Sequence, residues 1–186
     1  MTRPPLRLTW AVDRLAAREG ERIAEIGCGN GSAIAILLQQ VSPGFVLGVD
    51  RSERAIASAR RLHAASIASG QVAMVHREFT AARPDTPMDR VFAVNVNAFW
   101  RAPRTCFEEI AQWLRPRGSL LLVFEAPTPG KADAIARSLS ERDACAPCSL
   151  SSHCKHSGVS SLVALEFVRD ARTSAHGACQ PASRFS

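Results

Sequence analysis

The sequence predicts an α/β domain in which a mostly parallel β-sheet carries helices on both faces. Short apolar runs of strand type alternate with stretches of helical periodicity along most of the chain, as in successive βαβ units. The run SLLLVFE at 119–125 is almost continuously apolar, which is typical of a central parallel strand. A glycine-rich segment also joins the first expected strand to the helix after it.

The first elements follow from the residue pattern. A helical stretch at 8–18 precedes the first strand and is expected to pack on one edge of the sheet. Residues 22–27 (RIAEIG) predict that strand, residues 32–40 (SAIAILLQQ) a short buried helix, and Ser-Pro-Gly at 42–44 a turn. The second strand is expected at 45–50 (FVLGVD).

A longer amphipathic helix is expected at 52–69, where apolar side chains recur at helical spacing. Ser52 is a suitable N-cap for this helix, and Gly70 is a suitable stop. The third strand follows at 72–76 and a loop at 83–87.

The second half of the chain continues the alternation. It predicts a fourth strand at 90–95, a helix at 103–114 and a fifth strand at 119–125, with Arg-Pro-Arg-Gly as a break between the last two. A helix at 131–143 and a last strand at 161–169 complete the order.

Composition limits the classes of protein to consider. Of 186 residues, 46% are hydrophobic and 22% are charged, which is an ordinary balance for a globular domain. We expect one domain over residues 1–170 and a flexible tail at 171–186. No run approaches the ~18 apolar residues of a membrane span, and residues 1–10 lack the apolar core of a signal peptide. A cytoplasmic monomer or homodimer with no membrane contact is therefore expected.

The net charge of +6 comes almost entirely from arginine. A basic surface permits a nucleic-acid partner, but the sequence does not favour one because it has no appended RNA-binding module. A basic stretch at the start of and within the helix expected at 52–69 is expected to be a solvated face, with phosphate binding as the alternative; it contains Arg51, Arg54, Arg60 and Arg61. The six cysteines are expected to be reduced thiols.

The segment EIGCGNG at 25–31 carries the strongest functional signal. Its glycines allow a sharp turn, close approach of a ligand to the backbone, and a helix start with free N–H groups. Asp50 ends the second strand 19 residues after Gly31, close to the ~20 expected of an acid that binds ribose hydroxyls. The GxGxG spacing and the carboxylate of Glu25 disfavour NAD, because Glu25 would repel a pyrophosphate. They favour a ligand that carries an amine or a cation.

These segments resemble a known family. AEIGCGNGSAIAILL, followed by VLGVDRSERAI, is similar to the first two motifs of class I S-adenosylmethionine-dependent methyltransferases. MDRVFAVNVNAFW looks like the fourth-strand motif of that family, and IAQWLRPRGSLLLVFE looks like its helix and fifth strand. The resemblance covers about residues 8–125. It implies a Rossmann-like fold with an antiparallel last strand, S-adenosyl-L-methionine as methyl donor and S-adenosyl-L-homocysteine as product.

The resemblance also implies roles for individual residues. Glu25 would hold the methionine amino group, Asp50 would accept hydrogen bonds from both ribose hydroxyls, and Arg51 would flank the adenine. The other implied cofactor residues are Gly27, Cys28, Gly29 and Asn30 around the methionine portion, Gly31 at the helix start, Glu78 and Phe79 at the adenine, and Asn95 and Val96 near the sulfonium.

Aromatic and amide side chains follow the fourth strand, beyond the sheet edge where open α/β folds bind ligands. We expect Asn97, Phe99 and Trp100 to line the acceptor side of the cleft, with Trp10 closing it from the first helix. The alternative is that Phe99 and Trp100 pack against the following helix. The sequence offers no convincing general base, because His63 and His76 are expected on the scaffold.

Cysteine and histidine residues, which include zinc-ligand types, cluster between the expected helix at 131–143 and the expected last strand at 161–169. A sixth strand and its hairpin are also expected in this span. The cluster consists of Cys145, Cys148, His153, Cys154 and His156. A single Cys-x2-Cys with a short, irregular continuation is half of a zinc site, so we predict no metal. A redox pair is less favoured still, because no matching βαβ context surrounds the cysteines.

Taken together, the motifs predict methyl transfer from S-adenosylmethionine to a small-molecule acceptor. Three alternatives remain open from the residues. One is an RNA or protein methyltransferase that uses the arginine-rich surface, and another is a degenerate domain that binds the cofactor without turnover. An NAD-dependent oxidoreductase is the least favoured.

Overall fold

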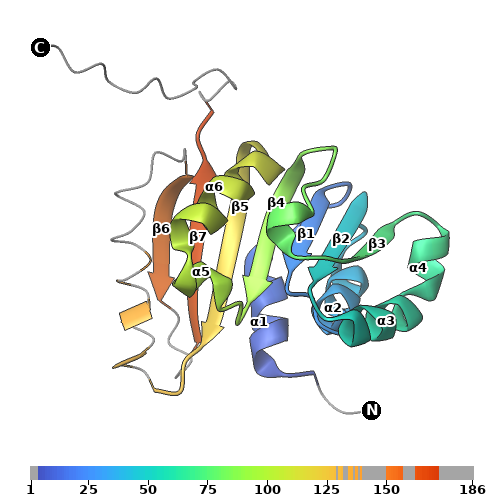
Figure 1. Cartoon of the computed structure of the whole chain (residues 1–186), viewed down its shortest axis with the longest axis horizontal. Coiled ribbons are helices and arrows are strands. Elements are labelled where there is room, and N and C mark those ends of the chain that lie inside the picture. Colours follow the sequence, from blue (N-terminus) through green and yellow to red (C-terminus); the bar gives the residue numbers. More distant parts are fainter. Residues whose placement is uncertain are drawn as a thin grey trace, which may run out of the picture.

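The computed structural model describes residues 4–128, 130–131, 134–135, 137, 139, 150–156 and 162–171. Seven strands form one sheet in the order β3-β2-β1-β4-β5-β7-β6. The strands β1 to β5 are parallel, while β7 is antiparallel to both β5 and β6. The expected fold class, with its antiparallel last strand, is confirmed (Figure 1).

Most elements lie where the residue pattern places them. The strands are β1 (Arg22–Ile26), β2 (Phe45–Asp50), β3 (Val72–His76), β4 (Met88–Val94), β5 (Leu114–Glu125), β6 (Leu150–His156) and β7 (Leu162–Arg169). The helices are α1 (Leu6–Leu15), α2 (Ser32–Gln40), α3 (Glu53–Leu62), α4 (Ala64–Ala68), α5 (Ala98–Arg101) and α6 (Pro103–Trp113), with a 3-10 turn η1 at Phe79–Ala81. Of the helix expected at 131–143, the residues described up to 139 are helical.

Two expectations about these elements are wrong. The helix expected at 52–69 is interrupted at His63, which lies between α3 and α4. The helix ends before the Arg-Pro-Arg-Gly segment as expected, but the fifth strand, expected at 119–125, already begins at Leu114 and includes that segment. Its pairing with β4 shifts between Met88 and Arg90, and Arg117 has a φ of 64°, so the segment forms an irregularity within the strand.

The hydrophobic core has one layer on each face of the sheet. On one face α6 contributes Phe107, Ile110 and Trp113, which are almost completely buried. On the other face lie α1, α2 and α3, whose apolar side chains pack on the alternate strand residues. Figure 1 shows α5 and α6 in front of β4, β5 and β7. The two layers hold the sheet rigid, so the loops at its carboxyl edge have a fixed base.

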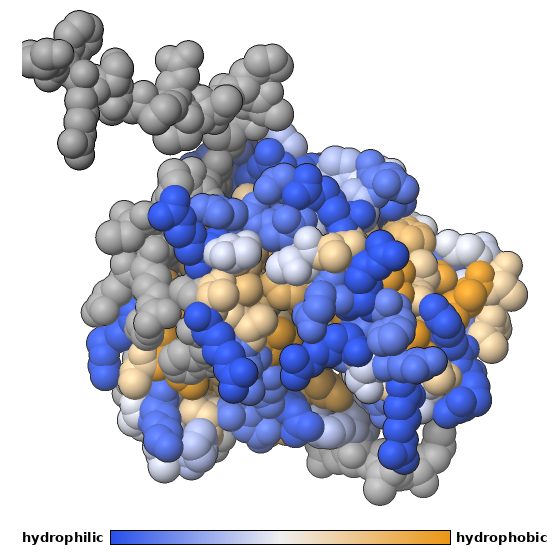
Figure 2. Space-filling model, in the orientation of Figure 1, coloured by the Kyte–Doolittle hydropathy of each residue, from blue (hydrophilic) through white to orange (hydrophobic). Residues whose placement is uncertain are grey.

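One edge of the sheet is partly apolar on its surface. Figure 2 shows apolar colour at the right of the view, where Figure 1 places α4 and the edge strand β3. Arg60 donates two hydrogen bonds, of 3.3 and 2.9 Å, to the carbonyl of Met74 in β3. This contact satisfies one carbonyl group of the exposed strand edge. No helix among the described residues is long and apolar enough to cross a membrane.

Candidate functional site

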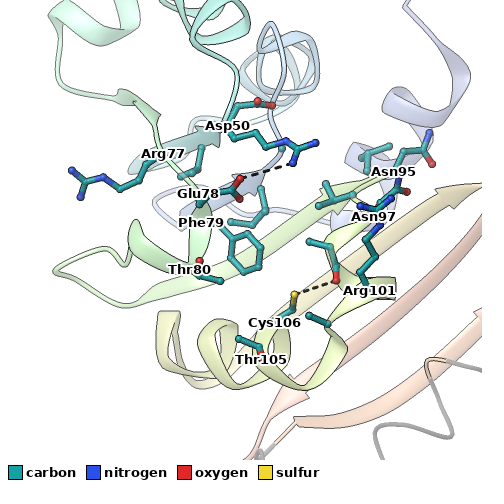
Figure 3. A pocket seen from close by; sticks show the side chains of 18 residues that line it. Asp50, Arg77, Glu78, Phe79, Thr80, Asn95, Asn97, Arg101, Thr105 and Cys106 are labelled. Atoms are coloured by element: carbon teal, nitrogen blue, oxygen red, sulfur yellow. Dashed lines mark hydrogen bonds and ion pairs between the residues drawn. The ribbon is translucent and has the colours of Figure 1, made fainter.

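A cavity of about 520 Å³ opens at the carboxyl ends of the parallel strands. It lies where the strand order reverses, because β1 has β2 on one side and β4 on the other. Ligands of open α/β sheets bind at this point of the fold, and the volume falls within the ~300–1,000 Å³ of typical ligand pockets. Figure 3 shows side chains from the ends of β2, β3 and β4 around it, with α5 and α6 as a further wall.

Asp50 lies at the end of β2 and lines this cavity. Its two carboxylate oxygens accept hydrogen bonds from the backbone N–H groups of Gly29, at 2.9 Å, and Ser52, at 2.8 Å. These bonds fix the orientation of the carboxylate and tie the glycine-rich loop to β2. Each oxygen keeps a second lone pair that can accept a ligand hydroxyl.

Gly27 begins the glycine-rich loop and contacts Val96 across the cavity floor. Its φ is 68°, and a Cβ added at this position would lie 2.6 Å from Cγ2 of Val96. Glycine is therefore required both by the backbone conformation and by the close approach of the two loops. Both residues line the cavity.

The rest of the loop, residues 28–31, does not line the cavity. The Asn30 side chain accepts hydrogen bonds from the N–H and the hydroxyl of Ser32 at the start of α2. Cys28 is buried, and burial raises the pKa of its thiol. The carbonyl of Gly31 contacts the ring of buried His63 at 2.9 Å. His63 thus lies on the scaffold, and its contact with Gly31 coincides with the interruption between α3 and α4.

Glu25 is buried in β1 beneath the loop, with only 3% of its surface exposed. Its Oε2 has no hydrogen-bond partner among the described residues. Burial, and then the charge of Asp50, raise the pKa of this carboxyl well above its usual range. A buried acceptor without a partner is costly, so Glu25 is suited to receive a donor from a ligand. The carboxyl itself is not part of the cavity wall.

The wall at the end of β3 consists of Arg77, Glu78 and Phe79. Glu78 pairs with Arg51 at 3.9 Å, and both side chains are exposed. The Phe79 ring is mostly buried and stacks on Phe99, with ring centroids 5.8 Å apart. The wall therefore offers a flat apolar surface next to polar groups, as an adenine would require.

Asn95 follows β4 and has a φ of 57°. It lines the cavity, but its side-chain oxygen accepts a hydrogen bond of 2.8 Å from the N–H of Glu125 at the end of β5. The Glu125 carboxylate in turn pairs with Arg7 of α1 at 3.2 Å. Asn95 thus links the ends of β4 and β5. The ion pair between Arg7 and Glu125 links α1 to the same edge of the sheet.

The four residues expected on the acceptor side have different positions. Asn97 lines the cavity. Phe99 does not, because it is fully buried and packs against Phe79 and Phe107, which corrects the expectation in favour of the packing alternative. Trp10 also lies away from the cavity: it packs on the core of the α1–α3 face, with the Arg14 guanidinium 4.8 Å above its ring. The side chain of Trp100 is outside the described part of the structure.

Several lining residues were not expected from the sequence. Arg101, Thr105 and Cys106 come from α5 and α6. The Cys106 thiol donates to the carbonyl of Ala98 at 3.4 Å, and burial raises its pKa to about 11, so the thiol stays protonated. A four-residue helix is too short to show periodicity, and the interruption at Ala102 separates Arg101 from Thr105 in the next helix, so no sequence pattern marked this wall.

Metal binding has no support in the described part of the chain, where no group of three ligand-type side chains could hold an ion. Cys145 and Cys148 lie outside that part, and of Cys154, His153 and His156 only the backbone is described, in β6. The prediction of no metal therefore remains a prediction.

Comparison with known proteins identifies the family of the chain. Residues 23–118 match a family model described as a methyltransferase domain. A ubiquinone biosynthesis O-methyltransferase of Aromatoleum aromaticum is 35% identical over 121 residues, which cover 62% of this chain and 48% of that protein. A trans-aconitate 2-methyltransferase of Azoarcus sp. is 29% identical over 109 residues, which cover 59% of this chain and 41% of that protein. The chain thus spans about half the length of the curated relatives it matches.

Solved structures show the same fold. A putative rRNA methylase from Clostridium thermocellum superposes with a TM-score of 0.67 at 13% identity, covering 90% of this chain and 100% of that one. A methyltransferase from Thiobacillus denitrificans, solved with S-adenosyl-L-homocysteine, has a TM-score of 0.56 at 22% identity, covering 72% and 55%.

The fold and the cavity define a Rossmann-like class I methyltransferase domain, for which S-adenosyl-L-methionine is the cofactor. The chain belongs to the methyltransferase-domain family whose model it matches over more than half of its length.

Proposed function

We propose that the protein transfers a methyl group from S-adenosylmethionine to a small-molecule acceptor. The observation that carries this proposal is the convergence of Gly27, Asp50, Phe79 and Val96 on one cavity at the strand-order reversal. The names of the relatives support a small acceptor, because they include a trans-aconitate methyltransferase and O-methyltransferases. A methyl-accepting oxygen is therefore the first chemistry to test.

The residues present fit the cofactor. Asp50 offers free lone pairs to the ribose hydroxyls, and Phe79 offers an apolar face to the adenine. Glu25, buried behind the cavity wall, offers an unpartnered carboxyl oxygen to the ammonium group, directly or through water. The sulfonium, when bound, supplies an activated methyl and a good leaving group. The protein then needs no covalent nucleophile, because alignment of donor and acceptor can supply several kcal/mol of the rate enhancement. A general base is required only for an acceptor that arrives protonated.

An RNA acceptor is the second candidate. Three arginines line the cavity, and the Arg51 side chain is 81% exposed at its mouth. A phosphate backbone would find such groups within reach, and its affinity would fall steeply with salt. The two remaining alternatives, a protein acceptor and cofactor binding without turnover, would use the same cavity.

Transfer of labelled methyl from S-adenosylmethionine separates these candidates. The protein is incubated with a panel of small hydroxy acids and phenols and, in parallel, with total bacterial RNA at low and high salt. The proposal expects label in a small product, and it expects Asp50→Ala to abolish it at limiting cofactor. Label found in RNA alone would establish the second candidate, and no label despite cofactor binding would favour a binding domain.

A further inference from the structure

The cavity holds three arginines, and two of them already have partners. Arg51 pairs with Glu78, and Arg77 donates to the carbonyl of Ala81 at 3.2 Å. Arg101 also lines the cavity, yet its guanidinium has no hydrogen bond or ion pair with any residue that the structure describes. Its five N–H donors remain available to a ligand.

Arg101 is the last residue of α5, on a different wall of the cavity from Asp50 at the end of β2 (Figure 3). Its backbone N–H donates to the carbonyl of Asn97 at 3.2 Å, so the two residues are four apart on one turn and share a face. The side chain of Asn97 likewise has no partner in the described part of the chain. Figure 3 shows both side chains on the same wall, next to Asn95.

The charge of the cavity favours an anion at this wall. The lining residues carry three guanidinium groups and two carboxylates, Asp50 and Glu78, an excess of one positive charge. The sulfonium of the cofactor adds another positive charge. A cationic acceptor would therefore be repelled, whereas an anionic group would neutralise Arg101 through charge-assisted hydrogen bonds.

We propose that the acceptor carries a carboxylate, and that Arg101, assisted by Asn97, holds this group while the methyl is transferred. The proposal rests on the methyl transfer to a small molecule proposed above and specifies its substrate class. Arg101 is then a residue that determines specificity, and it has no role in holding the cofactor.

The test compares matched acceptors that differ only in charge. The protein loaded with S-adenosylhomocysteine is titrated calorimetrically with small hydroxy acids, including 4-hydroxybenzoate, and with the corresponding primary amides. Turnover of each pair is measured with labelled S-adenosylmethionine. Arg101→Gln removes the charge, Arg101→Lys retains it without the planar fork, and Arg54→Gln removes an exposed arginine of α3 that does not line the cavity.

The proposal expects at least one acid to bind about 10-fold or more tightly than its amide. Arg101→Gln should abolish that preference, Arg101→Lys should keep part of it, and Arg54→Gln should leave it unchanged. Cofactor affinity should stay within a few-fold in all three variants.

Three results would overturn the proposal. They are equal binding of acids and amides, a preference for acids that survives in Arg101→Gln, and no measurable binding of any acid at millimolar concentration. A large loss of cofactor affinity in Arg101→Gln would do so too, because Arg101 would then serve the cofactor. Failure of the proposed function has a different signature, because label from S-adenosylmethionine would then appear in RNA alone or in no product, whether or not an acid binds to the wall at Arg101.

Discussion

Asp50 is held by two backbone N–H groups, and each of its oxygens keeps a free lone pair. Hydrogen bonds to a charged group contribute ~1.5–3 kcal/mol. We therefore expect Asp50→Ala to weaken cofactor binding by roughly 10- to 150-fold in calorimetry. Asp85→Ala, which removes an exposed carboxylate outside the cavity, is the matched control. An unchanged dissociation constant in a folded Asp50→Ala protein would refute the role.

Glu25 should make cofactor affinity depend on pH. Burial, and secondly Asp50, raise the pKa of its carboxyl, whereas an ammonium group beside it requires the ionised form. Affinity should therefore fall as the pH drops through the raised pKa and level off above it. Titrations across a pH series would show this slope in the wild-type protein, and the slope should be absent in Glu25→Gln.

The same carboxyl has the opposite effect on the stability of the cofactor-free protein. The folded-state pKa lies above the unfolded value, so the folded protein binds more protons and loses stability as the pH rises from the unfolded pKa towards the folded one. Glu25→Gln should thus melt at a higher temperature than the wild type at high pH, with a smaller difference at low pH. A lower melting temperature for the variant at every pH would contradict this account.

At the scale of elements, the loop after β1 and the loop after β4 meet at Gly27 and Val96. Gly27→Ala must place a Cβ at a φ of 68° and 2.6 Å from Val96. Gly29→Ala has a similar φ of 54° but meets nothing within 4 Å. The second variant should incur only the left-handed penalty of ~1–2 kcal/mol, and the first should lose ~1–3 kcal/mol more. Urea denaturation of both variants measures the difference, and equal losses would mean that the contact is relaxed easily.

Local pattern predicted β1, β2 and β4 well because each is a short, largely apolar run that lies mostly buried in the sheet. The bounds of α2, β2 and β3 match the expected ranges. The interruption at His63 could not be predicted, because the contact of its ring with the Gly31 carbonyl joins residues 32 positions apart. The start of β5 was missed because Arg-Pro-Arg-Gly has the composition of a turn, although it pairs as an irregular strand.

The sequence predicted the residues of the cavity where a sequence motif lies at the end of a strand, as it does at Gly27, Asp50 and Asn95. The wall from α5 and α6 was not predicted, because aromatic residues after a strand suit a cleft and a core equally well. Phe99 packs into a row with Phe79 and Phe107, while the polar face of the same turn, with Asn97 and Arg101, lines the cavity. Which face of a one-turn helix points inward depends on tertiary packing.

For the whole molecule, we predict that folding requires no metal. Elemental analysis of protein purified without added metal should find far less than one zinc per chain. A stoichiometric zinc that is lost, together with folding, in Cys145→Ser or Cys148→Ser would show that the cysteine-rich segment is a structural site.

The arrangement of the layers determines where the cofactor can bind. The strand-order reversal between β2-β1 and β4-β5 leaves one edge at which the loops carrying Gly27, Asp50 and Val96 meet. In this account a nucleoside with an amino-acid group suits that edge, because its ammonium group can pair with the unpartnered Glu25 carboxyl beneath the loop. The pyrophosphate of a dinucleotide has no donor with which to make that contact.

Calorimetric titration of the wild-type protein with S-adenosylmethionine, S-adenosylhomocysteine and NAD tests this central claim most directly. The account predicts saturable, one-to-one binding of both sulfur nucleosides and binding of NAD that is at least about 10-fold weaker, a difference of ~1.4 kcal/mol or more. Binding of NAD with equal or greater affinity, or no binding of either sulfur nucleoside by the folded protein, would contradict it.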